Sequence, residues 1–580
     1  MMRTSMLGVL CVAVAAIGCK SEKPAGKPAD PPAANKPASK PSASAVALGT
    51  KGSTGAGDTG STAAAGDPGA QGPRPTPPTN APRSADSGFR PDKDGFKFAN
   101  YGNSEIRGLV NLTPDDMVQL FGPEVCASSE GGCTLSPAGQ QWMEEQNKGM
   151  DGGHCEGFAA IALLIKDHKV SLADLGADSP QSAKIEGNVK LQRQIATWFV
   201  TQATAPTRTA ELKGYTPTEI VDFYADSLVS KKEVYSLGFY KRGGGGGHAV
   251  TPYAVEDKGG DVQWIKVYDN NYPNEERHVE VNRKTNTWKY EGSTRPDVPK
   301  SEYEGDADTR TLTLTPTSPR LAKQECPFCG DVGAGAPAPK GSRQVWMDGE
   351  GDLLIEDGAG HKLGMDNGKL VNTIPGSDAV LLKSRDEMHH EPVYLVPEGG
   401  SKLEVTLDGT RLTKDSISTV ALIAHGYTFA VDGIALHKGQ KDRITFSQDS
   451  SEVKYRTDTK ETPLLELGIQ TAGADYLFAF RIAGEAAGQE VDLKIDLAKG
   501  TLALFAHGKD PTSRFDVKIT RIDPKKAPEV YEHKGTPIAA ADTLVFNYKD
   551  WKGAHQGMDV GTDKGGDGAV DATAPLGDQH

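Results

Sequence analysis

The sequence predicts an α+β domain followed by an all-β region, with a disordered tether before them and a disordered tail after them. Helix patterns and then strand patterns fill residues 89–325. Over residues 343–540, short apolar strands alternate with Asp-Gly and Gly-Gly turns, which is typical of one or two β-sandwich modules. Residues 19–88 are rich in Pro, Ala, Gly and Ser, and residues 541–580 are rich in Gly and Asp. Such compositions bury too little apolar surface to order a chain.

The N-terminus indicates export and lipid attachment. Arg3 precedes an apolar stretch from Met6 to Ile17, which is shorter than the roughly 20 residues of a membrane-spanning helix. The stretch leads into Gly18 and Cys19, and this junction resembles the lipobox of bacterial lipoproteins. We therefore expect residues 1–18 to be a signal peptide. Cys19 would carry a lipid that anchors the protein in a bacterial cell envelope, at the periplasmic face or the cell surface.

Composition narrows the classes of partner. The chain of 580 residues has a net charge of −14, which disfavours nucleic acid because that ligand requires phosphate neutralisation. No cysteine and histidine spacing in the sequence matches a four-ligand zinc site, so neither a metal nor a cofactor is expected. The β region carries no catalytic motif and is interpreted as accessory, with a cell-wall or surface ligand as its candidate partner.

Cysteine spacing predicts two local disulfides and one free thiol. Of the seven cysteines, one leaves with the signal peptide and Cys19 is the lipid site. In an oxidising compartment, four more are expected to pair with near neighbours. The pairs are Cys126 with Cys133 and Cys326 with Cys329. The second pair begins a linker predicted over residues 326–342, and Cys155 is left over.

The surroundings of Cys155 suit a reactive thiol. Gly152, Gly153 and His154 precede it, and the apolar run from Ala159 to Ile165 predicts a buried helix. Cys155 would then lie at the N-terminus of this helix, where the dipole favours thiolate. A small buried core cysteine explains this segment equally well.

Residues farther along favour the catalytic alternative. Five glycines lead into a strand that His248 opens, and Asp269 ends the next strand. A nucleophile on a helix, a histidine and then a carboxylate form a workable triad order, because histidine takes the thiol proton and the carboxylate fixes its tautomer. Asn270 is the alternative orienting residue.

These segments resemble papain-like cysteine peptidases. The nucleophile motif of that family, Cys-Trp-Ala-Phe, resembles Cys155-Glu156-Gly157-Phe158. The strand that carries the family's histidine resembles Gly247-His248-Ala249-Val250. The strand that carries the third catalytic residue, which is Asp in the bacteriocin-processing relatives, resembles Val267-Tyr268-Asp269. The chain also looks like bacterial exported proteins with His-Ala-Val, Tyr-Asp-Asn-Asn and Cys-Pro-Phe-Cys motifs. The resemblance implies a papain-like domain over residues 89–325 acting on a peptide or protein substrate. It makes Cys155 the nucleophile, His248 the base and then the acid, and Asp269 the orienting group.

The sequence departs from that family at two points. The family places an oxyanion-stabilising glutamine just before the cysteine, whereas here the candidates are Gln146 and Asn147, farther upstream. Glu156 also replaces a tryptophan and puts a negative charge beside the thiolate. Two alternatives therefore accompany the peptidase: a transglutaminase-like acyl-transferase, and a catalytically inactive papain-shaped binding lipoprotein.

Overall fold

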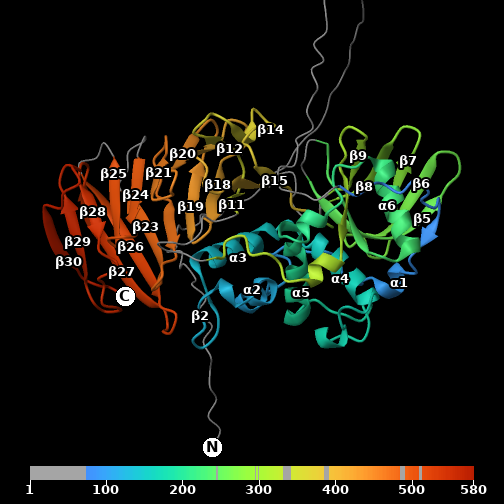
Figure 1. The fold of residues 1–580 in the computed structure, drawn as a ribbon, viewed down its shortest axis with the longest axis horizontal. Coiled ribbons are helices and arrows are strands. Elements are labelled where there is room, and N and C mark those ends of the chain that lie inside the picture. The colour runs from blue at the N-terminus through green and yellow to red at the C-terminus, as the bar shows by residue number, and fades with distance from the viewer. Residues whose placement is uncertain are drawn as a thin grey trace, which may run out of the picture. The chain divides into compact units, whose positions relative to one another are not determined.

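A computed structural model describes residues 74–242, 246–293, 295–297, 299–330, 341–383, 391–483, 490–507 and 512–580 (Figure 1). Strands make up more of this part of the chain than helices. The predicted signal peptide, the lipid site Cys19, the tether up to residue 73 and residues 331–340 of the predicted linker lie outside the described residues. No described helix is long and apolar enough to cross a membrane.

Helices gather in the first part of the chain. They are α1 Pro91–Asp94, α2 Pro114–Phe121, α3 Pro137–Gly149, α4 Cys155–Lys166, α5 Val189–Val200 and α6 Pro217–Ser230. Capping boxes begin two of them: Thr113 with Asp116 starts α2, and Thr216 with Glu219 starts α6. Each box satisfies backbone N–H groups that have no partner within the helix. The second box is recognisable in the sequence itself, because Thr216-Pro217-Thr218-Glu219 has the spacing that predicts a helix start.

Helix α4 is the central helix of this part. Its residues from Cys155 to Leu164 are all buried, because α5 and strand β5 (His248–Asp257) both pack against it. Gly157 allows the close approach of α5: a Cβ atom there would lie 2.1 Å from the carbonyl oxygen of Ile195. The apolar run after Cys155 is therefore a buried helix, as predicted.

An antiparallel sheet follows the helices. Its order is β10-β4-β5-β6-β7-β8-β9, with β1 beside β5. Besides β5, the strands are β1 Ala85–Asp86, β4 Tyr235–Phe239, β6 Val262–Tyr268, β7 Arg277–Asn282, β8 Thr287–Gly292, β9 Ser301–Asp306 and β10 Leu312–Pro316. The register pairs Thr251 of β5 with Tyr268 of β6. The start of β5 therefore lies beside the end of β6, and this register brings His248 close to Asp269.

Two larger antiparallel sheets form the rest of the described chain. One has the order β15 Asp378–Val380, β16 Val393–Pro397, β11 Ser342–Asp348, β18 Ser416–Ala424, β19 Tyr427–Leu436, β22 Leu464–Ile469, β23 Asp475–Ala483, β26 Thr512–Ile522 and β27 Glu529–Ala539. The other has the order β14 Lys369–Asn372, β13 Lys362–Asp366, β12 Asp352–Asp357, β17 Leu403–Asp408, β20 Lys441–Phe446, β21 Glu452–Arg456, β24 Glu490–Asp496, β25 Thr501–His507, β28 Thr543–Phe546, β29 Met558–Asp563 and β30 Ala572–Leu576.

These two sheets form a single sandwich-like unit. One apolar core takes side chains from both sheets, with Phe429 of β19 packing on Phe446 of β20 at 5.7 Å between ring centroids. The other face of the first sheet is covered too, because Trp346 and Ile423 share a second core with Trp142 of α3. This core joins the β region to the helical part of the chain, and it also contains Leu382 of the segment that follows β15.

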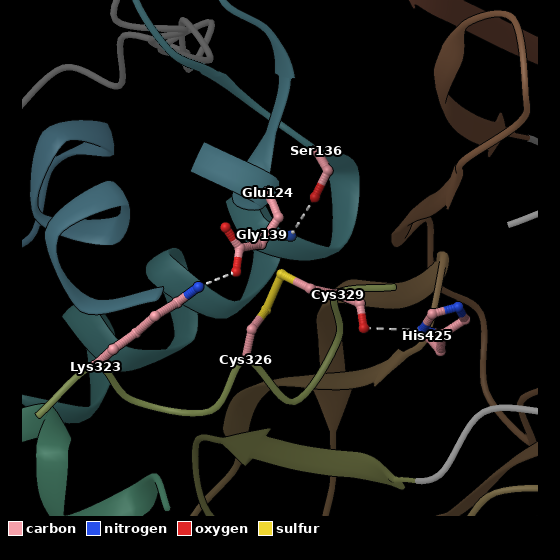
Figure 2. Close-up of a disulfide and its surroundings, with 7 residues drawn as sticks. All are labelled: Glu124, Ser136, Gly139, Lys323, Cys326, Cys329 and His425. Carbon is pink, nitrogen blue, oxygen red and sulfur yellow. Dashed lines mark hydrogen bonds and ion pairs between the residues drawn. A yellow bond between two sulfur atoms is a disulfide. The ribbon is translucent and has the colours of Figure 1, made fainter. Parts of the chain in front are cut away.

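Both predicted disulfides are present, and they indicate an oxidising, extracytoplasmic environment. Cys126–Cys133 closes the small hairpin of β2 Cys126–Ser128 and β3 Thr134–Leu135. Cys326–Cys329 lies between the helical part and the β region, where the carbonyl of Cys329 is 3.2 Å from Nδ1 of His425 (Figure 2).

Three expectations about unstructured segments need correction. The linker predicted from residue 326 begins inside the fold, because Phe328 is buried against Phe121 and Trp142. The predicted tether extends too far at its C-terminal end, since β1, at residues 85–86, pairs with β5 and Arg83 forms an ion pair with Asp257 at 2.9 Å.

The C-terminal tail is the third of these expectations. Residues 541–580 contribute β28, β29 and β30, and Phe546 and Met558 are fully buried in the sandwich core. The apolar residues of this segment are widely spaced among Gly and Asp, so its composition resembles that of a disordered tail. The segment is ordered because β28 pairs with the edge of β25, and this pairing cannot be deduced from composition.

Candidate active site

Helix α4 begins at Cys155, as the sequence predicts. The turn before it is held by Asn100, whose Oδ1 accepts a 2.7 Å hydrogen bond from the backbone N–H of His154. Gly153 has φ of +125°, and a Cβ there would lie 2.8 Å from Nδ2 of Asn100. The glycine therefore lets the chain turn sharply into the helix, which leaves Cys155 at the helix N-terminus, where the dipole favours an anion.

His248 and Asp269 are in direct contact. Nε2 of His248 lies 2.9 Å from Oδ1 of Asp269, and both side chains are fully buried. The backbone N–H of Asn271 donates to the same Oδ1 at 2.8 Å, and the Tyr290 hydroxyl donates to Oδ2. These bonds fix the carboxylate, so it orients the imidazole as the third member of a triad would.

The site favours a charged imidazole. Burial lowers the pKa of His248, but the Asp269 carboxylate and Cys155 outweigh burial and raise this pKa to about 10. Burial likewise raises the pKa of Asp269, and His248 reverses the effect and lowers it below the ordinary value. Nδ1 of His248, the nitrogen that Asp269 does not contact, has no hydrogen-bond partner among the described residues. Nδ1 is therefore available to the thiol.

Cys155 is the free cysteine of the described chain. Its side chain is fully buried, and its Sγ donates a 2.7 Å hydrogen bond to the backbone carbonyl of Lys383. Lys383 follows strand β15 of the β region and is 228 positions away in the sequence. The β region therefore contributes the backbone group that caps the thiol.

The neighbouring histidine is a poor base. Burial lowers the pKa of His154 to about 4, so its ring is neutral. Its two nitrogens lie 2.8 Å from the carbonyl of Tyr101 and 2.9 Å from Oδ1 of Asn111. Because both nitrogens already have partners, His248 is the histidine that is free to exchange a proton with Cys155.

The two predicted oxyanion candidates differ in their contacts. Asn147 bonds the backbone of Leu112 through both its amide oxygen, at 3.0 Å, and its amide nitrogen, at 3.2 Å, so its side chain is committed elsewhere. Gln146 is fully buried on α3, and neither amide atom has a partner among the described residues. The last residue of α3, Gly149, lies next to Leu382, which precedes the residue that caps the thiol. Gln146 therefore remains the candidate donor.

Asn270, the alternative orienting residue, has a different place. Its Nδ2 donates to the backbone carbonyls of Cys155, at 3.2 Å, and Ala249, at 2.9 Å. No hydrogen bond between the Asn270 side chain and the His248 ring is found among the described residues. Asn270 thus joins the nucleophile helix to the histidine strand, and Asp269 is the residue that contacts the imidazole.

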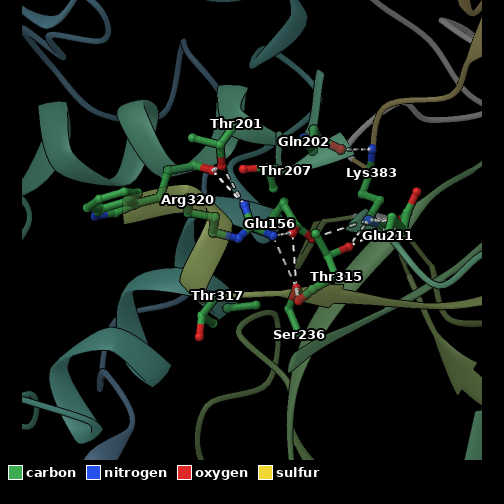
Figure 3. Close-up of polar contacts among 12 residues, drawn as sticks. Glu156, Thr201, Gln202, Thr207, Glu211, Ser236, Thr315, Thr317, Arg320 and Lys383 are labelled. Carbon is green, nitrogen blue, oxygen red and sulfur yellow. Dashed lines mark hydrogen bonds and ion pairs between the residues drawn. The ribbon is translucent and has the colours of Figure 1, made fainter. Parts of the chain in front are cut away.

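The negative charge of Glu156 is compensated. Figure 3 shows Glu156 between Arg320 and Lys383. Arg320 forms a fully buried ion pair with Oε1 of Glu156, Ser236 donates to the same oxygen at 3.0 Å, and Lys383 Nζ lies 3.8 Å from Oε2. Two cations thus oppose the expected effect of Glu156 on a neighbouring thiolate.

Sequence reasoning missed the residues that complete the site from a distance: Tyr290, Arg320, Glu211 and Lys383. Each is a single polar residue in a strand, a turn or an apolar segment, and no local pattern marks it. No cluster of three or more potential metal ligands occurs in the residues that the structure describes. Comparison with protein-family models, with curated proteins and with solved structures gave no match.

Proposed function

We propose that this protein is a lipid-anchored, exported cysteine peptidase that hydrolyses peptide or amide bonds through Cys155, His248 and Asp269. The observation that carries the proposal is the buried contact of His248 with Asp269, next to a free cysteine at a helix N-terminus. An imidazolium beside a thiol stabilises the thiolate, which is the nucleophilic form. A purely structural cysteine has no need of this arrangement.

The proposed reaction has two stages. The thiolate of Cys155 attacks the carbonyl carbon of the substrate, the C–N bond breaks, and His248 transfers its proton to the departing amine. Water then attacks the resulting thioester while His248 accepts one of its protons, and the acid leaves as the thiolate is restored. Asp269 keeps the imidazole in place during both stages.

Charge on the tetrahedral intermediate requires hydrogen-bond donors. The backbone N–H of Cys155, at the first position of α4, is one candidate, since the first amides of a helix have no partner within it. The side-chain amide of Gln146 is the second candidate, because it is buried and has no partner among the described residues.

Location and partners follow from the same proposal. The disulfides support a compartment outside the cytoplasm. Attachment through a lipid on Cys19 and a peptide or protein substrate are part of the proposal. For the β region we propose an accessory role, with a cell-wall or surface ligand as its candidate partner.

Peptide turnover tests the proposal. A library of peptides carrying a fluorescent amide leaving group should be cleaved by the protein in an open form of the site, and Cys155→Ala should abolish cleavage while leaving the circular dichroism spectrum unchanged. Cleavage that survives Cys155→Ala would contradict the proposal. Incorporation of an amine into a glutamine peptide without hydrolysis would favour the acyl-transferase. Absence of both reactions together with an unreactive thiol would favour the inactive binding protein.

A further inference from the structure

A short segment of the β region lies across the candidate active site. It comprises Leu381, Leu382 and Lys383, directly after strand β15. Tyr240 donates to the carbonyl of Leu381 at 3.1 Å, and Gln202 accepts from the backbone N–H of Lys383 at 2.8 Å. The carbonyl of Lys383 accepts from Cys155 Sγ at 2.7 Å. The backbone of the segment is therefore held by hydrogen bonds up to the residue that meets the nucleophile.

The side chain of Lys383 fills a matching pocket. It is 2% exposed, and its Nζ lies 2.6 Å from Oε1 of Glu211 and donates to Oγ1 of Thr315 at 2.8 Å (Figure 3). Oε2 of Glu156 lies 3.8 Å away. A carboxylate at the end of the pocket and a second one beside it compensate the buried ammonium group.

Gly238 gives the lysine stem its room. A Cβ atom at this position would lie 2.3 Å from Cε and 2.8 Å from Cδ of Lys383. A Cβ atom there would therefore displace the lysine stem from its present position. Gly238 belongs to β4, the neighbour of the strand that carries His248, so the wall of the pocket is built from the catalytic sheet.

We infer that Gly238, Thr315, Glu211 and Glu156 form a specificity pocket for a lysine side chain, and that Lys383 occupies it as an intramolecular pseudosubstrate. The inference rests on the proposed peptidase function and names its substrate class. A substrate residue that donates its acyl group to Cys155 must place its carbonyl at the thiol and its side chain in the adjoining pocket, and Lys383 does both. The thiol meets the carbonyl oxygen in a hydrogen bond, and the segment thereby excludes other substrates from the buried site.

Charge makes the pocket selective. A neutral side chain of the same length would leave the Glu211 carboxylate buried without its cation, and an uncompensated buried charge is strongly unfavourable. A site built to pair with one polar group rejects analogues that lack it. The pocket should therefore prefer lysine to norleucine, which has a similar stem and no ammonium group.

The test uses the full chain and two reactive ketones. Lys383→Gly should empty the pocket, and a lysine chloromethyl ketone should then modify Cys155 faster than a norleucine chloromethyl ketone by a factor of about 10 or more. Adding Glu211→Gln should reduce this ratio to about 3 or less. Lys454→Met, which removes a lysine that pairs with Asp492 at 2.9 Å in the β region, is the matched control and should leave both rates at their wild-type values.

Iodoacetamide separates the inference from the function on which it rests. At about pH 6 it should alkylate Cys155 faster in Lys383→Gly than in the wild type, because the cap is gone. Fast alkylation with equal ketone rates would overturn the lysine pocket and leave the peptidase proposal intact. Slow alkylation in Lys383→Gly, equal to that of a denatured chain, would overturn the peptidase proposal itself. If Lys383→Gly does not fold, Glu211→Gln alone should raise the iodoacetamide rate, and an unchanged rate would overturn the pseudosubstrate.

Discussion

Arg320 forms a fully buried ion pair with Glu156, the residue next to Cys155, although 164 positions separate them in the sequence. The guanidinium group also donates to Oγ1 of Thr201 at 2.6 Å and to the carbonyl of Trp198 at 3.0 Å. The sequence suggests that Glu156 opposes a thiolate, whereas the structure gives the carboxylate a cation of its own. Arg320 is therefore a positioning residue for the first turn of α4.

Arg320→Met should destabilise the protein by about 3–5 kcal/mol, because the substitution leaves the Glu156 carboxylate buried without a guanidinium partner. The urea midpoint, measured by tryptophan fluorescence, gives the loss. Adding Glu156→Leu removes the unpaired charge, so the double variant should recover most of the lost stability. Arg90→Met is the matched control.

Arg90 pairs with Asp86 at 2.9 Å, and the two side chains are 47% and 49% exposed. Water can solvate the Asp86 carboxylate when the guanidinium group is removed, so Arg90→Met should cost much less than Arg320→Met. Equal costs for Arg320→Met and Arg90→Met would contradict the importance of burial at Glu156. A double variant no more stable than Arg320→Met would show that the guanidinium bonds to Thr201 and Trp198, and not the buried charge, determine the cost.

Stability should fall as the pH rises from about 6.5 to about 10, because of His248. Its folded-state pKa of about 10 lies above its ordinary value of 6.5, so the protonated form stabilises the fold. This contribution is complete below about 6.5 and is lost as the pH approaches about 10. Urea midpoints across this range, measured in the wild-type chain so that both Asp269 and Cys155 remain beside the imidazole, should decline with pH.

Asp269→Asn in the same chain is the control for this decline. It removes the carboxylate that raises the pKa of His248, so the slope over this range should become shallow. The other ionisable groups that interact with Asp269 include Tyr290, Tyr272 and Arg277, and their pKa values are all raised above the ordinary ones, so they keep their protons over most of this range. A slope that survives Asp269→Asn would mean that another group causes the pH dependence.

Local sequence patterns predict Cys155, His248 and Asp269, because these three residues lie at the ends of helices and strands that follow one another along the chain. Cys155 starts a helix after a glycine turn, and His248 and Asp269 occupy the start and end of neighbouring strands, so their order along the chain already implies that they meet. The capping box at Thr216 and both disulfides are equally local. The sequence also predicts an all-β second half, because short apolar strands alternate with glycine turns there.

Contacts between residues more than a hundred positions apart could not be predicted in this way. Lys383 and Arg320 are single cations in unremarkable segments, and only the folded chain brings them to Glu156. The prediction of a disordered tail over residues 541–580 is wrong for a similar reason. Its first strand, β28, forms because it pairs with β25, which two other strands separate from it in the sequence. Sequence composition gives the mean hydropathy of a segment, whereas the strands that pair with the segment determine whether it is ordered.

One titratable thiol should be found in the mature protein, and it should appear only after unfolding. Among the cysteines of the described chain, four are in disulfides and Cys155 is fully buried under the carbonyl of Lys383. Alkylation without reductant, before and after denaturation, followed by mass spectrometry of the peptides, measures both properties. Three free thiols after denaturation would mean that one disulfide is absent in solution.

Removing residues 541–580 should destabilise the protein by about 5 kcal/mol or more, because large apolar side chains leave the sandwich core. Phe546, Tyr548, Trp551 and Met558 are all buried there. Loss of β28 also exposes the edge of β25, which favours aggregation. Urea unfolding and light scattering measure the two effects. Removal of the last two residues alone is the control, and equal stability of the two truncated chains would contradict the assigned strands.

Loss of the His248 imidazole should slow alkylation of Cys155 once the site is open. In the Lys383→Gly chain, iodoacetamide should react with Cys155 at about pH 6, because His248 and the start of α4 favour an anion at this position. His248→Ala removes both the cation and the proton acceptor, so alkylation at about pH 6 should slow by a factor of about 10 or more and peptide cleavage should stop. Asp269→Asn should be milder than Asp269→Ala, since asparagine still accepts a bond from the imidazole N–H. Unchanged reactivity in His248→Ala, with the circular dichroism spectrum retained, would mean that the two residues are not coupled and that the domain is a binding protein.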